Sequence, residues 1–113
     1  MTAPTPSAPS AGSAGEPMAR LLTALRLDQV DEDHFTGPSL HQPHGRVFGG
    51  QVLGQTLIAA SRTVDPGRPV HSMHGYFLRA GDASRPLRFL VERMRDGRSF
   101  SARRVHAVQD GRI

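Results

Sequence analysis

We predict an α+β fold in which an antiparallel sheet wraps around one central helix, because the hydrophobic pattern changes along the chain. Residues 49–63 carry apolar side chains at helical spacing, whereas apolar and polar side chains alternate from residue 70 onward, as in strands. Two Asp-Gly pairs, at residues 96–97 and 110–111, indicate antiparallel hairpins. One helix packed on one antiparallel sheet satisfies all three observations.

The first seventeen residues, MTAPTPSAPSAGSAGEP, hold too few large apolar side chains to offset chain entropy. We predict a disordered tail over residues 1–17 and one small domain over residues 18–113. A domain of this size buries a small share of its surface, so we expect a homo-oligomer or pairing with a second domain. The chain shows neither a signal peptide nor an apolar run that could span a bilayer, so we predict a cytoplasmic protein with no membrane partner.

Short elements precede the central helix. The spacing of Leu21, Leu22 and Leu25 predicts a helix over residues 18–27, which the acidic run at 28–33 ends. The stretch HFTG at 34–37 predicts a short strand that stops at Gly37-Pro38, and LHQPHGR at 40–46 predicts a loop.

The central helix is predicted over residues 49–63. Its apolar side chains cover most of the circumference, with Gln51, Gln55 and Arg62 as the chief polar interruptions, so we expect a buried helix. The turn sequence DPGRP ends it.

Three strands follow, in VHSMHGYFLRAG at 70–81, PLRFLVERMRDG at 86–97 and SFSARRVHAVQDG at 99–111. The last two should pair antiparallel through the first Asp-Gly turn. Only Arg112 and Ile113 follow the second Asp-Gly turn, so we expect a missing hairpin arm and an incomplete domain. This outline is that of a hot-dog fold, although the pattern alone does not separate it from other small α+β domains.

The composition excludes several kinds of chemistry. The chain has no cysteine, which rules out disulfides, thiolate metal sites and a cysteine nucleophile. All fourteen basic residues are arginines, ten of them from Arg68 onward, and the net charge is +4. Because no nucleic-acid-binding motif accompanies them, we predict no nucleic-acid partner. An anionic small molecule fits this basic half better, and a solvated surface is favoured over both.

Gly49 and Gly50 begin the predicted central helix, where glycine costs helix stability. Unpaired N–H groups and the helix dipole at that position can bind an oxygen that carries negative charge, and the missing Cβ atoms let a carbonyl approach. Alternatively, Gly50 and Gly54 form a Gly-x-x-x-Gly step that allows close packing. Spacing alone favours packing and leaves both interpretations open.

The remaining polar residues give weak signals. His74 or His44 could act as a general base near the helix start, although a lone histidine is more often structural. His41, His44, His71 and His74 match no metal-ligand spacing, so we predict no metal site. The central helix lacks a carboxylate that could activate water, since Gln51 can orient a water molecule but cannot take its proton. Asp82 is typical of an Asx-turn, and no serine-hydrolase elbow is present.

Three stretches, RVFGGQVLGQTLIAA, HSMHGYFLRAGD and ERMRDGRSFSARRVHAVQDG, together resemble the N-terminal half of the TesB-like type II acyl-CoA thioesterases. The resemblance runs from about Leu21 to Ile113. It implies a protein with two hot-dog domains, of which this chain holds the first. It also implies hydrolysis of fatty acyl-CoA to free fatty acid and CoA, without a metal or other cofactor.

The resemblance also says where the catalytic residues lie. The family's Asp, Thr or Ser, and Gln belong to the second hot-dog, beyond Ile113, so no catalytic residue is assigned to this chain. Gly49, Gly50, Gln51 and His74 are predicted to bind substrate. We expect the chain alone to be inactive; a non-catalytic acyl-thioester binding or assembly module and a non-functional gene fragment remain the alternatives.

Overall fold

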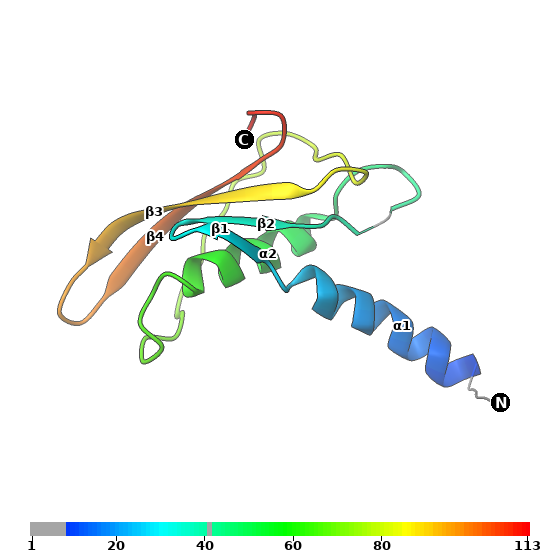
Figure 1. The fold of residues 1–113 in the computed structure, drawn as a ribbon, viewed down its shortest axis with the longest axis horizontal. Helices are drawn as coiled ribbons and strands as arrows, with labels where there is room; N and C mark the ends of the chain where they lie inside the picture. Colours follow the sequence, from blue (N-terminus) through cyan, green and yellow to red (C-terminus); the bar gives the residue numbers. More distant parts are fainter. Residues whose placement is uncertain (1–8, 41) are drawn as a thin grey trace.

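The computed structural model describes residues 9–40 and 42–113 of the chain (Figure 1). Within them lie α1 (Pro9–Ala24), β1 (Asp28–Asp31), β2 (His34–Gly37), α2 (Gly49–Ser61), β3 (Leu87–Asp96) and β4 (Ser101–Val108). The strands form one antiparallel sheet in the order β1-β2-β3-β4. Helix α2 lies along one face of this sheet, and α1 extends away from it (Figure 1). The predicted α+β arrangement of a hot-dog fold, in partial form, is confirmed.

Strand β3 carries the core because it has a neighbour on each side. Its side chains alternate, so that Leu87, Phe89 and Val91 are buried while the residues between them are exposed. Phe89 pairs with Phe35 of β2 on one side and Ala107 of β4 on the other, and both phenylalanines are fully buried. The apolar face of the sheet therefore packs against α2, as the alternation of the sequence predicts.

Both Asp-Gly turns form. The turn between β3 and β4 is a loop in which the N–H of Gly97 donates to the carbonyl of Phe100 at 2.8 Å, so the predicted hairpin is confirmed. At the second turn, Asp110 and Gly111 have φ values of 52° and 74°, and Gln109 and Arg112 bond to each other. Two successive positive φ angles are typical of a type I′ turn, which joins antiparallel strands.

Helix α2 begins at Gly49 as predicted and ends two residues before the predicted Thr63. Its burial differs from the prediction. The buried side chains are Gln51, Gln55 and Ala59, whereas the leucines are only half-buried. The helix is covered on the side that faces the sheet and α1, and its other apolar side is open among the described residues.

The segments before α2 also differ from the prediction. The first helix was expected over residues 18–27 but spans Pro9–Ala24. Its first position tolerates proline because no N–H is needed there, and the following alanines favour helix, so residues 9–17 of the predicted disordered tail are helical. Asp28–Asp31, predicted as part of a break, is strand β1. Its side chains are all exposed, so only backbone pairing with β2 forms it and no alternation reveals it.

The strand predicted over residues 70–81 is wrong, because the structure shows no strand in this stretch. Its backbone has no strand partner among the described residues, and hydrogen-bonded pairing is what defines a strand. Tyr76, Phe77 and Leu78 are 81%, 61% and 67% exposed. The segment runs past α2 and β4 as an extended stretch with apolar side chains that little else covers.

Candidate functional site

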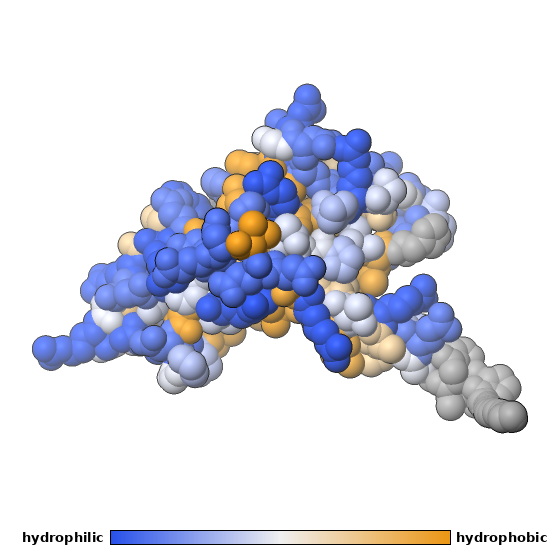
Figure 2. Space-filling view, viewed as in Figure 1, coloured by the Kyte–Doolittle hydropathy of each residue, from blue (hydrophilic) through white to orange (hydrophobic). Residues whose placement is uncertain are grey.

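A large hollow of about 1950 Å³ lies between α2, β4 and residues 67–82. The half-buried side of α2, including Leu53, Thr56 and Leu57, forms its floor. Figure 2 shows hydrophobic residues around the middle of the face in view and hydrophilic residues at the end where the β3–β4 hairpin lies. Ligand sites for small molecules are usually about 300–1,000 Å³, so this hollow is larger than a single small ligand needs.

The N-terminus of α2 opens at one end of this hollow. Phe48 precedes the helix without a side-chain cap, and its carbonyl accepts the N–H groups of Gln51 and Val52 at 3.0 and 3.3 Å. Within residues 9–40 and 42–113, nothing accepts the N–H of Gly49 or Gly50. Two donors at the positive end of the helix dipole are thus available to an oxygen atom.

The glycines of α2 also allow close packing. A Cβ atom on Gly49 would lie 3.2 Å from Cζ of Phe77, and one on Gly50 would lie 2.6 Å from Cε2 of Phe48. A Cβ on Gly54 would lie 3.2 Å from Cδ2 of Leu25. Gly49 lines the hollow and Gly50 does not, so Gly49 is the better placed of the two to meet a ligand.

Gln51 lies on the opposite side of α2 from the hollow, in a buried amide network with Gln55. Oε1 of Gln51 accepts the N–H of Leu40 at 2.9 Å, and its Nε2 donates to the carbonyl of Pro38 and to Oε1 of Gln55. Nε2 of Gln55 donates to the carbonyls of Ala24 and Pro38 at 3.0 and 2.8 Å. These partners use all four N–H donors of the two amides, and each amide oxygen accepts one bond. The structure therefore gives Gln51 an internal role away from the hollow.

Three histidines, His71, His74 and His106, line the hollow. His74 lines the hollow, is exposed and stacks on Tyr76 with ring centroids 4.8 Å apart. His71 contacts Phe100 edge to face at 5.8 Å, and Nδ1 of His44 accepts the N–H of Arg46 at 3.0 Å. His41 is outside the described residues. Gly49 and His74 thus share the hollow, whereas Gly50 and Gln51 lie outside its lining.

The carboxylates nearest the hollow already have hydrogen-bond or ion-pair partners. Asp82 accepts the N–H and hydroxyl of Ser84, which with Arg85 lowers its pKa, and forms the predicted Asx-turn. Asp110 pairs with Arg85. A carboxylate with a lowered pKa is a poor general base at neutral pH. In the part of the chain that the structure describes, no group of three His, Asp or Glu side chains could hold a metal ion.

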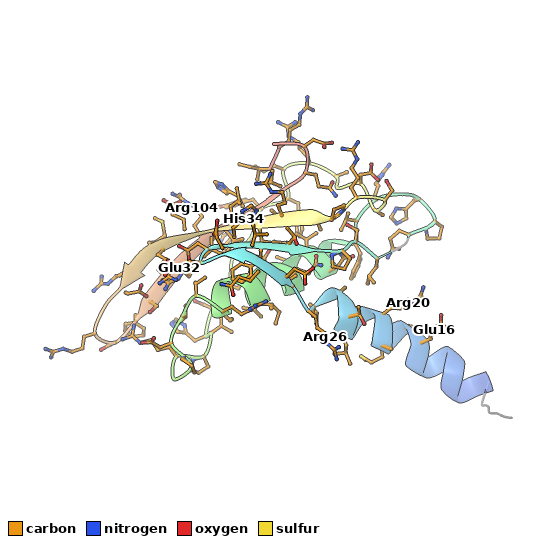
Figure 3. The ribbon with its side chains drawn as sticks, in the orientation of Figure 1. Glu16, Arg20, Arg26, Glu32, His34 and Arg104 are labelled. Carbon is orange, nitrogen blue, oxygen red and sulfur yellow. The ribbon has the colours of Figure 1, made fainter. Side chains whose placement is uncertain are left out.

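Many arginines of the second half have internal partners. Arg103, 5% exposed, donates to Thr63 and pairs with Asp96 at 2.9 Å, and Arg68 donates to the carbonyls of Gly97 and Arg98. Arg104 pairs with Glu92 at 2.9 Å. In Figure 3 Arg104 lies at the sheet, whereas Arg20 lies along α1, away from it. None of the described helices is long and apolar enough to cross a membrane.

Comparison with known proteins identifies this architecture. Residues 38–113 match the family model of the acyl-CoA thioesterase N-terminal domain. Human acyl-coenzyme A thioesterase 8 is 46% identical over 106 residues, and acyl-CoA thioesterase 2 of Haemophilus influenzae is 43% identical over 89 residues; the alignments cover 89% and 79% of this chain. The tesB protein of Mycobacterium avium subspecies paratuberculosis is 46% identical over 81% of this chain, with a TM-score of 0.79.

A Ralstonia eutropha protein, described as a thioesterase candidate related to phenylacetic acid degradation, shows the same fold at 22% identity and a TM-score of 0.60. The alignment covers 91% of this chain and 89% of that one. The curated relatives are much longer: this chain spans 33% of the human protein and 31% of the Haemophilus protein, and 37% of the Mycobacterium avium structure.

Proposed function

The chain belongs to the acyl-CoA thioesterase family through its N-terminal domain, and from that premise we propose that it supplies the acyl-binding part of an enzyme that hydrolyses fatty acyl-CoA to free fatty acid and CoA. One observation carries this proposal. An apolar hollow opens at a helix N-terminus with two unpaired N–H donors, and the nearest carboxylates are engaged elsewhere. Such a surface can bind an acyl thioester, and its engaged carboxylates are poor bases for activating water.

The proposed reaction needs three contributions: a base for water, a donor for the carbonyl oxygen, and apolar contacts for the acyl chain. A base must take a proton from water, whose oxygen attacks the thioester carbon; the C–S bond then breaks, and the sulfur takes up the proton from the base, so that CoA leaves as the thiol. The carbonyl oxygen gains negative charge during the attack, and in this proposal the N–H of Gly49 stabilises it. Leu53 and Leu57 would contact the acyl chain. No base is assigned to this chain, so residues 1–113 alone should release little or no CoA.

Among the predicted substrate-binding residues, Gly49 and His74 remain proposed contacts because both line the hollow. Gly50 and Gln51 lie outside the lining, and Gln51 would act by holding the start of α2 in place. The exposed ring of His74 suits the rim, where it could contact the polar part of the substrate. We also propose a cytoplasmic protein that associates with itself or with a second hot-dog domain, which the exposed apolar residues 76–78 support.

Catalysis is tested by mixing the purified chain with acyl-CoAs of different lengths and a thiol-reactive dye. We expect no CoA release above the uncatalysed rate. Turnover by the chain alone would show that a base exists within it and would overturn the proposed division of work. Adding the C-terminal part of the Mycobacterium avium tesB protein, of which this chain spans 37%, should restore CoA release if this chain supplies a working acyl-binding part.

Binding is tested with a non-hydrolysable acyl-CoA thioether. Leu53→Asp should weaken binding by about tenfold or more, because it puts a charge into the apolar floor. Leu90→Asp is the matched control, since Leu90 alternates with the buried residues of β3 and is 37% exposed. Binding without any rescue of turnover would favour the alternative, a non-catalytic acyl-thioester module.

A further inference from the structure

The loop at the tip of the β3–β4 hairpin gathers positive charge. Arg95 and Arg98 are exposed on the hairpin, and Arg68 reaches the loop from the segment after α2. The guanidinium group of Arg68 donates to the carbonyls of Gly97 and Arg98 at 2.7 and 2.8 Å. Nε of Arg95 lies 2.9 Å from the position that a Cβ atom on Gly97 would take. Gly97 thus brings two guanidinium groups close together, and a third follows on the next residue.

None of these three arginines pairs with an acidic side chain among the described residues. Asp96 lies at the start of the loop, but its carboxylate pairs with Arg103 at 2.9 Å and accepts a hydrogen bond from Ser101. Like charges that lie close together repel, and the repulsion lasts until a counter-charge binds. The loop therefore carries three positive charges that the described part of the chain does not neutralise.

The arginines farther along the same two strands are different, because each has an acidic partner. Arg93 pairs with Asp33 at 2.9 Å and with Glu32 at 3.3 Å, and Arg104 pairs with Glu92 at 2.9 Å. Figure 2 shows hydrophilic residues at the end of the molecule where the hairpin lies. The unneutralised charge of the hairpin is therefore concentrated at its tip.

The backbone of the loop adds hydrogen-bond donors to these charges. The N–H of Gly97 donates to the carbonyl of Phe100 at 2.8 Å, whereas nothing in residues 9–40 and 42–113 accepts the N–H of Arg98 or Ser99. Successive N–H groups in a turn can bind an anion, and guanidinium groups bind phosphate oxygens in pairs. A phosphate group suits this set of donors, because its oxygens accept from several of them at once.

We propose that the β3–β4 loop binds a phosphate group with two negative charges, which Arg95 and Arg98 contact while Arg68 adds its charge and holds the loop. The site lies beyond the C-terminal end of α2, where Arg103 donates to the carbonyl of Thr63. The helix start lies at the other end, about 20 Å away along the 13 residues of α2. The site goes beyond the proposed function and does not depend on it, because a phosphate compound without an acyl chain should occupy it.

The test uses the full 113-residue chain and inorganic pyrophosphate at constant ionic strength. Calorimetric titration should show saturable binding, with the largest NMR shifts at the amides of residues 97–100. Arg95→Gln and, separately, Arg98→Gln should each weaken binding about three- to tenfold, because each removes charge-assisted hydrogen bonds. Arg20→Gln removes the same charge from α1, away from the sheet, and should leave the affinity unchanged. Absence of saturable binding, equal weakening by all three variants, or largest shifts outside the loop would each overturn the proposal.

Two further probes distinguish the sources of such a phosphate group. Adenosine 3′,5′-bisphosphate represents a soluble nucleotide, and phosphatidylcholine vesicles with and without phosphatidic acid represent a lipid surface. Nucleotide binding that Arg98→Gln weakens would assign the site to a soluble phosphate compound. Cosedimentation with the acidic vesicles alone, weakened by the same variant, would assign it to a lipid headgroup. If Arg98→Gln changes neither, the loop does not recognise phosphate and the proposal is wrong, whatever the acyl-CoA thioether does at the helix start.

Discussion

Gln51 and Gln55 lie one turn apart on α2 and connect it to two segments far away in the sequence. Their amides reach the carbonyl of Pro38 and, through Gln55, the carbonyl of Ala24 at the end of α1. Gly37 allows this approach, because a Cβ there would lie 2.8 Å from Nε2 of Gln55 and 2.5 Å from Cδ2 of Leu27. A fully satisfied polar network orders a core, whereas a partly satisfied one destabilises it.

Gln55→Ala should therefore lower the free energy of unfolding by about 2–4 kcal/mol, since it leaves one N–H of Gln51 and the carbonyl of Ala24 without partners and removes one of the two bonds to the carbonyl of Pro38. Urea unfolding followed by circular dichroism measures the change. Gln29→Ala is the control, because Gln29 is exposed on β1 and should cost less than about 0.5 kcal/mol. Equal losses in both variants would mean that the network does not stabilise the fold.

Asp96 makes the stability of the β3–β4 hairpin depend on pH. Hydrogen bonds from Ser101 and Arg103 lower its pKa below the ordinary 3.8. A carboxylate with a lowered folded-state pKa stabilises the fold above its unfolded pKa, and this stabilisation is lost as the pH falls through the folded value. Thermal melts from pH 6 to pH 2 should show a smaller loss of stability below pH 4 for Asp96→Asn than for the unchanged protein. Parallel curves for the two proteins would contradict this role.

The burial of Gln51 and Gln55 was harder to predict than helix α2 itself. Their hydrogen-bond network explains why. Hydrophobic periodicity assigns polar side chains to the outside, because an unpaired buried amide is costly. Here the partners come from the carbonyls of Pro38 and Ala24, 17 and 31 residues from Gln55. No pattern within α2 contains that information. A pair of glutamines four residues apart on an otherwise apolar helix is the signal that could have suggested it.

The helices and strands fall into two groups, those formed by features of their own sequence and those formed only by pairing with a distant segment. The Asp-Gly turn, the alternation in β3 and the apolar run of α2 are local features, and each predicted its element correctly. A lone strand is different, because its existence depends on a neighbour. Residues 70–81 alternate as a strand should, yet no described strand pairs with them. Strand β1 shows the reverse, since backbone pairing with β2 forms it without any alternation.

Amide hydrogen exchange should separate these classes of element. Backbone amides of β3 at residues 89–92 should exchange at least about a hundredfold more slowly than those of residues 70–81, because β3 has two neighbours and buried side chains while 70–81 has no backbone partner among the described residues. Strand β4 should be intermediate, with one paired side. Protection of residues 70–81 equal to that of β3 would show that this segment finds a strand partner in solution, through a second copy or a rearranged sheet.

The candidate site exists only in the folded molecule, because its residues come from separate segments of the chain. Spacing alone placed Gly49 and Gly50 at a helix start, and the structure adds that Gly49 lies beside an open apolar hollow. His74 reaches the same hollow from a segment about twenty-five residues later, a proximity that only the fold can create. The chain spans about a third of the length of its curated relatives, and the proposal that it does not activate water alone rests on the engaged carboxylates around the hollow.

The position at which the folded domain begins also depends on contacts across the whole chain. Residues 15–20 of α1 are exposed, and the helix reaches the body only near its end, where Ala24 is buried and Leu25 packs on Gly54 (Figure 1). A helix with few tertiary contacts adds little to stability. We therefore predict that residues 18–113 fold as the unit.

Deleting residues 1–17 should change the free energy of unfolding by less than about 0.5 kcal/mol, as for surface changes elsewhere. Ala24→Glu in the full chain should cost more than about 2 kcal/mol, because it forces a charge into the contact between α1 and α2. Urea unfolding of both variants decides the point. A large loss on deletion, with the same loss for Ala24→Glu, would show that α1 stabilises the body along its whole length and would move the domain boundary toward the start of α1.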